Sequence, residues 1–210
     1  MKCIEKFGVN PWLRIWFHPQ GTIRSINQFD RHYCVFPLGL GGGFALTLIL
    51  VLYRMTKGSG TSHVLLFCLV PVLGVFLGLS LLHIVGAFLH FTGKLLGGKA
   101  RMSSVRAAIA WSQLPQIMLT LLAGAWGLYM YPILFGQPLV LRLMFLIVPV
   151  CIVLLFVWYV VMLSNTLAAV QGFSAWWGLV NVIIPILLVF AVLFYVYVAP
   201  IVIVDEMIGL

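Results

Sequence analysis

Charged residues are scarce in this chain of 210 residues: only 8% are charged, and four Asp and Glu stand against 12 Lys and Arg. A soluble domain carries about 25% charged residues, so this chain has too few polar side chains to cover a soluble surface. The shortage excludes a cytosolic enzyme, a secreted disulfide domain and a disordered regulator. Hydrophobic residues make up 63% of the chain and the mean hydropathy is +1.17, which predicts an integral membrane protein.

Motifs that carry chemistry are equally scarce. The four cysteines, Cys3, Cys34, Cys68 and Cys151, stand singly, with no CxxC pair and no histidine at ligand spacing. We therefore expect reduced thiols and neither a disulfide framework nor a metal site. No Asp or Glu lies within a long apolar run, which argues against a Ser–His–Asp arrangement. The first ten residues are mixed polar and do not predict a signal peptide. The expected protein has no catalytic residue and no cofactor.

Five apolar runs without Asp, Glu, Lys or Arg are long enough to cross the hydrocarbon core, which takes on the order of 20 residues. They cover about 36–53, 64–90, 107–131, 143–163 and 178–204. Backbone groups in lipid must be satisfied within the segment, and the runs lack the alternating pattern of a membrane barrel. The predicted fold class is an all-α membrane protein with five transmembrane helices.

Basic residues predict the orientation of these spans. With the N-terminus inside, nine Lys and Arg fall in cytoplasmic segments and three fall outside. Because basic residues concentrate on the cytoplasmic side, we predict a multi-pass protein of a bacterial inner membrane with its N-terminus inside. Residues 1–33 form a cytoplasmic or interfacial segment, 34–204 the transmembrane domain, and 205–210 a short tail outside. We interpret the basic residues as setting the orientation in the membrane and as contacting anionic headgroups. No nucleic-acid partner is therefore expected.

Residues 10–33 form no span, but their pattern is specific. Asn10 followed by Pro11 predicts a helix start, with a capping side chain before a proline at the first helical position. Tryptophans beside arginines are typical of a helix lying among lipid headgroups. The predicted interfacial anchor residues are Trp12, Arg14, Trp16 and Arg24. The alternative is an N-terminal segment packed against the helix bundle.

Neutral polar side chains occur mostly in the cytoplasmic halves of the spans: His83, close to the midplane, and His90 in the second, Gln113 and Gln116 in the third, and Asn181 in the fifth. Hydrogen bonds between helices explain such residues. The alternative is a water-filled vestibule open to the cytoplasm, since ionisable groups within membranes are functional candidates. A histidine there can change charge near neutral pH. The two histidines lie about 10 Å apart along one helix, too far to share a metal ion.

Small residues and prolines complete the pattern. The segment Gly39–Gly43 has GxxxG spacing inside the first span, which predicts close helix packing. No Lys-Ser/Thr pair follows it, so it is not a phosphate loop. Residues Ser80, His83, Ala87 and His90 follow at spacings of 3, 4 and 3, which predicts a single face of the second helix. One proline lies in every span, and each tends to kink its helix: Pro37, Pro71, Pro115, Pro149 and Pro185.

Three stretches resemble a known family. They are Asn10–Arg24 (NPWLRIWFHPQGTIR), Gly97–Pro115 (GGKARMSSVRAAIAWSQLP) and Val170–Trp176 (VQGFSAW). Together they resemble bacterial members of the Yip-domain family, relatives of eukaryotic membrane proteins that bind Ypt and Rab GTPases. The resemblance implies five spans, a cytoplasmic N-terminus and no catalytic residue. The eukaryotic relatives bind GTPases through longer N-terminal regions. Because only about 33 residues precede the first span here, GTPase binding is not implied.

The expected function is non-enzymatic organisation or scaffolding of the membrane. The expected partners are the lipid bilayer and its anionic phospholipid headgroups, together with a second copy of the chain or another membrane protein. The alternative is a small transporter or channel for a neutral or weakly charged solute, which would use the polar vestibule.

Overall fold

The computed structural model describes residues 10–56, 63–130 and 139–208, and all regular structure in these ranges is helical. The elements are α2 (Pro11–Phe17), α3 (Pro19–Phe29), α4 (Val35–Thr56), α5 (His63–Ser80), the π turn η1 (Leu81–Val85), α6 (Gly86–Leu95), α7 (Met102–Ser112), α8 (Leu114–Met130), α9 (Leu139–Gln171) and α10 (Ala175–Ile208). The prediction of a helical protein is confirmed for this part of the chain.

Each predicted span corresponds to one helix or to consecutive helices, apart from residue 131, which lies outside the described residues. The first falls in α4, the second in α5, η1 and α6, the third in α7 and α8, the fourth in α9 and the fifth in α10. Three described segments are long and apolar enough to cross a membrane: Cys68–Leu95, Val153–Gln171 and Ala175–Val192. Val35–Val51 is a shorter apolar helix.

The third span is divided rather than continuous. Helix α7 ends at Ser112 and α8 begins at Leu114, with Gln113 between them. Pro115 lies in the first turn of α8, where its missing N–H removes no helical bond that would otherwise form. By contrast, Pro71 lies inside helix α5. Among the five prolines, only Pro115 coincides with a boundary between two helices.

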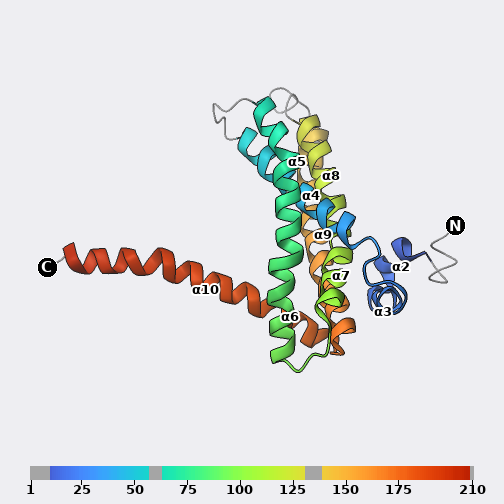
Figure 1. Ribbon diagram of the computed structural model, residues 1–210. Helices are drawn as coiled ribbons and strands as arrows, with labels where there is room; N and C mark the ends of the chain where they lie inside the picture. The colour runs from blue at the N-terminus through green and yellow to red at the C-terminus, as the bar shows by residue number, and fades with distance from the viewer. Residues whose placement is uncertain (1–9, 57–62, 131–138, 209–210) are drawn as a thin grey trace.

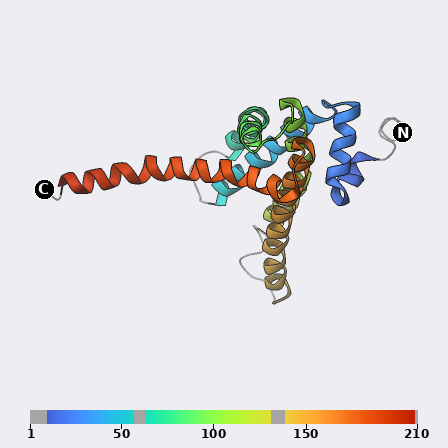
Figure 2. The same ribbon diagram turned by 90° about the horizontal axis from the view of Figure 1, so that it is seen from below.

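Helices α4, α5, α7, α8 and α9 form a bundle in which α4 packs on α5 and α8, and α9 packs on α7 and α8. Helices α6 and α7 lie at the lower end of Figure 1. The short helices α2 and α3 lie against one side of this bundle, next to α7 and α9. Helix α10 starts against α9 and α6 and then leaves the bundle on the side opposite α2 and α3, in both Figure 1 and Figure 2. The buried core is centred on α7 and includes residues of α2, α3 and α9 as well as of α4, η1, α6 and α10.

Helices α4 and α5 make the most extensive contact between two described elements, and glycine makes their approach possible. Gly39 and Gly43 of α4 face Gly74 and Gly78 of α5. A Cβ added at Gly43 would overlap backbone atoms of both α5 glycines. The predicted close packing at Gly39–Gly43 is therefore confirmed. Its partner is a second GxxxG pair, which the sequence carries at positions 74 and 78.

Candidate functional site

The N-terminal segment begins with the expected cap. The Asn10 side chain accepts a hydrogen bond from the Trp12 N–H at 3.1 Å, and Pro11 opens helix α2. His18 then ends α2 and precedes Pro19, the first residue of α3. Its backbone, at φ −132° and ψ 62°, is not helical, so the chain changes direction between the two short helices. This turn lets Arg14 of α2 and Arg24 of α3 border the same hollow.

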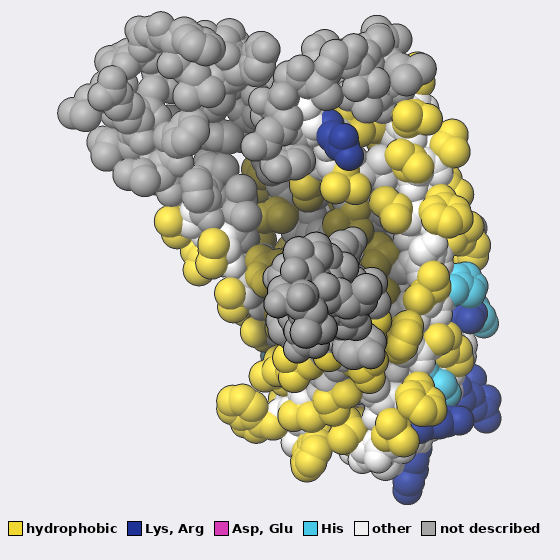
Figure 3. Space-filling model, turned by 90° about the vertical axis from the view of Figure 1, so that its left-hand side faces the viewer, with side chains coloured by type: hydrophobic (Ala, Val, Ile, Leu, Met, Phe, Trp, Pro, Cys, Tyr) yellow, Lys and Arg dark blue, Asp and Glu magenta, His cyan; other side chains and the backbone are white. Residues whose placement is uncertain are grey.

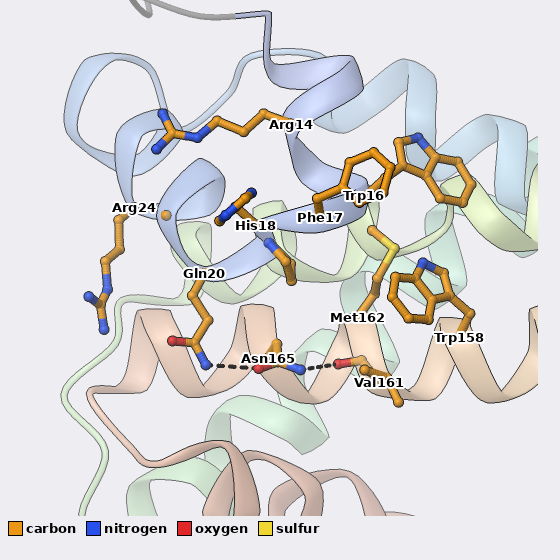
Figure 4. A pocket seen from close by; sticks show the side chains of 12 residues that line it. Arg14, Trp16, Phe17, His18, Gln20, Arg24, Trp158, Val161, Met162 and Asn165 are labelled. Carbon is orange, nitrogen blue, oxygen red and sulfur yellow. Dashed lines mark hydrogen bonds between the residues drawn. The ribbon is translucent and has the colours of Figure 1, made fainter.

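The hollow is a pocket of about 490 Å³ between these two helices and α9. On the N-terminal side it is lined by Arg14, Trp16, Phe17, His18, Pro19, Gln20, Gly21 and Arg24, and on α9 by Trp158, Val161, Met162 and Asn165. Figure 4 shows that its two ends differ in chemistry. Arg14, Arg24 and Gln20 lie toward one end, and Trp16, Met162 and Trp158 lie toward the other.

The walls of the pocket are fixed by buried contacts. Ile15 of α2 and Ile23 and Ile26 of α3 are completely buried, and they anchor the helix pair in the core. One hydrogen bond crosses to the bundle, from Gln20 Nε2 to Asn165 Oδ1 at 2.8 Å. The Asn165 amide in turn donates to its own helix, at the carbonyl of residue 161. The pocket is therefore a structured feature of the described chain.

The polar end of the pocket is positively charged. Arg14 and Arg24 are exposed, and within the described residues neither guanidinium forms an ion pair. The residues that line the pocket include no Asp or Glu. Two exposed guanidinium groups at one end of a partly apolar pocket suit an anionic group with an apolar tail, since guanidinium binds carboxylate or phosphate through paired hydrogen bonds.

The structure brings together three of the four predicted anchor residues. Arg14, Trp16 and Arg24 all line the pocket, whereas Trp12 packs on Trp111 with ring centroids 5.0 Å apart. The helix pair also packs on the bundle, as the alternative expected. Contact with lipid headgroups stays a prediction. Sequence reasoning missed the α9 wall, for which Asn165, a polar residue at the end of an apolar run, was the available signal.

Two of the predicted polar residues are buried in different helix contacts. Asn181 of α10 accepts a hydrogen bond from Thr92 Oγ1 and donates to the Leu89 carbonyl at 3.3 Å, so it joins α10 to α6. Gln113 is 1% exposed and lies against Gly42 of α4. Its Oε1 is buried and has no hydrogen-bond partner among the described residues.

The remaining three predicted residues do not join these two. His83 is exposed, and its Nδ1 lies 2.9 Å from the Leu79 carbonyl of the preceding turn. His90 is half-buried, and its buried Nδ1 has no partner within the described chain. Gln116 is half-buried on α8. The described contacts place Gln113 and Asn181 in separate helix interfaces, and a shared vestibule stays a prediction.

Gln171, which sequence reasoning assigned no role, joins three segments. Its Oε1 accepts from the Ala100 N–H at 3.2 Å, and its backbone carbonyl accepts from the Lys99 N–H at 3.2 Å. Its side chain also lies against Gly93 and Gly98, where a larger residue would overlap it. Gln171 therefore ties the link between α6 and α7 to the end of α9. It lies within the VQGFSAW stretch that carried part of the family resemblance.

The Asn181 contact gives a prediction about stability. Replacing Asn181 with leucine and Thr92 with valine, singly and together, should give a coupling of about 0.6 to 1.7 kcal/mol in the free energy of unfolding. The reason is that each single change removes the same hydrogen bond between α6 and α10. Reversible unfolding in mixed micelles measures the coupling.

The matched control is His83→Leu, because His83 is exposed and contacts the backbone of its own helix. It should change the free energy of unfolding by less than about 0.5 kcal/mol. A coupling of zero between Asn181 and Thr92 would show that this pair does not hold the helices together. That result would favour a water-filled site.

These features define a helical integral membrane protein with a structured N-terminal helix pair. The family model of the Yip1 domain matches residues 13–197, which is most of the chain. The protein belongs to the Yip1-domain family. No curated protein and no solved structure matches the chain. Among the described residues, no group of three His, Cys, Asp or Glu is placed to hold a metal ion.

Proposed function

We propose that this protein is a non-enzymatic, multi-pass protein of a bacterial inner membrane that organises the cytoplasmic leaflet. In this proposal five helices span the membrane with the N-terminus inside, and α10, which leaves the bundle sideways in Figure 1, turns in the bilayer to lie along the other spans. The helix pair α2 and α3 lies at the headgroups of the cytoplasmic leaflet and holds anionic phospholipid there. The bundle fixes the position of this pair, so the protein acts as a scaffold rather than as a catalyst.

One observation carries the proposal: the helix pair is built into the bundle on one side and is basic and aromatic on the other. Ile15, Ile23 and Ile26 are buried against the bundle. On the outer side Leu13 is 68% and Phe17 is 81% exposed, next to the exposed Arg14 and Arg24. Exposed apolar rings beside arginines are typical of an element that inserts among anionic headgroups.

The lengths of the helices support this placement. Helix α9 has 33 residues and is therefore about 50 Å long, whereas the hydrocarbon core is about 30 Å thick. About 20 Å of α9 must reach into the headgroup region or beyond it. The helix pair packs on the C-terminal half of α9, between Trp158 and Asn165, which is the cytoplasmic half if the N-terminus is inside.

The surface agrees with this placement. Figure 3 shows hydrophobic side chains over much of the described part of one face, while most of the visible basic side chains lie toward its lower end and one lies near the top. That end carries the link between α6 and α7, with Lys94, Lys99 and Arg101 exposed. Basic residues on one side of a membrane protein favour the cytoplasmic side.

The experiment that tests the proposal places an environment-sensitive label on the full chain. Leu13→Cys, and separately Lys99→Cys, would be made after the four native cysteines are replaced with serine. In inverted inner-membrane vesicles an impermeant maleimide should label both positions, and it should label neither in intact spheroplasts. The label at position 13 should report a less polar environment than the label at 99, because in this proposal the exposed Leu13, which does not line the pocket, lies among the headgroups.

Two results would contradict the proposal. Labelling of either position in spheroplasts would invert the orientation. Equal polarity at the two positions would place α2 in water. Solute flux or ionic conductance through reconstituted proteoliposomes would instead support the alternative, a small transporter or channel whose cytoplasm-facing vestibule uses His83, His90, Gln113, Gln116 and Asn181.

A further inference from the structure

We propose that the pocket between α2, α3 and α9 binds a single anionic phospholipid of the cytoplasmic leaflet. Its phosphate would lie between Arg14 and Arg24, and the start of an acyl chain would lie along Trp158 and Val161. The inference rests on the proposed function, because it needs the helix pair at the headgroup level. It adds a discrete binding site to what would otherwise be a diffuse attraction between charges.

The first argument is that two arginines from two different helices border the same end of the pocket (Figure 4). Arg14 comes from α2 and Arg24 from α3, and the turn at His18 brings both to the pocket. Figure 4 shows both side chains at its polar end, with Gln20 near them. Because the lining holds no carboxylate and the arginines have no ion pair within the described chain, their charge is available to a ligand. Arginine binds phosphate with two parallel hydrogen bonds.

The second argument is the direction of the pocket. Its α9 wall runs from Trp158, at the apolar end, to Asn165, at the polar end. The seven steps from Trp158 to Asn165 cover about 10 Å along the helix axis. The apolar end lies nearer the middle of α9, and the polar end nearer its C-terminus. A phospholipid of the leaflet on the C-terminal side has the same orientation, with its phosphate outward and its chains inward.

The third argument is size and chemistry. A pocket of about 490 Å³ is within the range of sites that hold small organic molecules, about 300–1,000 Å³. A free phosphate ion would need only the arginine end and would leave the exposed parts of Trp16, Trp158 and Val161 without a partner. A zwitterionic lipid such as phosphatidylcholine also carries a phosphate, but its trimethylammonium group would lie close to the two arginines and repel their charge. An anionic phospholipid satisfies both ends of the pocket.

The test measures lipid binding to the full chain in phosphatidylcholine nanodiscs. A fluorescent phosphatidylglycerol should bind at least tenfold more tightly than the same fluorophore on phosphatidylcholine. The double variant Arg14→Gln/Arg24→Gln should weaken phosphatidylglycerol binding at least tenfold. Val161→Trp, which fills the apolar end without removing charge, should weaken it to a similar extent.

Matched controls separate a discrete site from charge alone. Lys99→Gln/Arg101→Gln removes two exposed basic groups at the link between α6 and α7, and Val153→Trp adds the same bulk to α9 outside the pocket. Both should keep the affinity of the unchanged protein within about twofold. Only variants whose melting temperature equals that of the unchanged protein are compared. Loss of folding is then not mistaken for loss of binding.

The inference is overturned if both lipids bind equally or if the two double charge variants weaken binding alike. It is also overturned if Val161→Trp binds as well as Val153→Trp, or if millimolar inorganic phosphate displaces the lipid. The label at position 13, outside the pocket, reports separately on the proposed function. A less polar label together with failed lipid selectivity overturns the pocket alone, and a label in water overturns both.

Discussion

Replacing Trp111 with alanine should lower the free energy of unfolding by about 3–5 kcal/mol, the cost of removing a large aromatic side chain from a packed core. Trp111 of α7 is completely buried. Its ring packs on Trp12 at a centroid distance of 5.0 Å and stacks on Tyr33 at 6.1 Å. Its Nε1 donates to the Tyr33 carbonyl at 3.2 Å. One side chain therefore connects α7 to both ends of the N-terminal segment.

The control is Trp176→Ala, since Trp176 is 78% exposed at the start of α10. This substitution should change the free energy of unfolding by no more than about 0.5 kcal/mol. Unfolding in mixed micelles measures both variants, and intrinsic fluorescence follows the loss of the Trp12 contact. If Trp111→Ala is no more destabilising than Trp176→Ala, the helix pair is not held on the bundle as the structure describes.

Features that depend on neighbouring residues could be predicted from the sequence. Asn10 and Pro11 begin α2 as expected, because a cap needs only the residues next to it. The glycine spacing at Gly39–Gly43 indicated a close helix contact for the same reason. The helical class followed from the apolar runs, since lipid leaves a backbone few alternatives.

Features that depend on distant residues could not be predicted. Gln20 and Asn165 are 145 positions apart, and no local pattern pairs them. The docking of α3 on α9, and with it one wall of the pocket, depends on that pair and on the buried isoleucines. Gln171 is a similar case: its partners are the backbone groups of Lys99 and Ala100, which carry no side-chain signal.

The second predicted span shows where the regular period of an α-helix fails. The spacing of Ser80, His83 and His90 predicted one face of a regular helix. The structure instead has a π turn at Leu81–Val85, whose wider turn shifts the residues that follow around the axis. His83 is exposed and His90 is half-buried, so their environments differ. The period of 3.6 residues does not hold through a π turn. No residue type in the segment Leu81–Val85 predicts that a π turn forms there.

Replacing Gly43 with alanine should lower the free energy of unfolding by about 3 kcal/mol, at the upper end of the cost of overpacking a core. The added Cβ would overlap the Gly74 carbonyl and the backbone of Gly78. Backbone atoms cannot move aside as the end of a side chain can, so α4 and α5 must separate. This contact is the most extensive between two described elements, and its separation exposes the neighbouring glycines as well.

The control is Gly41→Ala, two residues away on the same helix. Its Cβ would meet only the end of the Ile117 side chain, with the nearest atom, Cδ1, at 3.0 Å. Both substitutions gain the same helix propensity, about 1 kcal/mol, so the difference between them isolates the packing of α4 on α5. Unfolding in mixed micelles should find Gly41→Ala within about 1 kcal/mol of the unchanged protein. If the two variants are equally stable, helices α4 and α5 do not approach as closely as the facing glycines require.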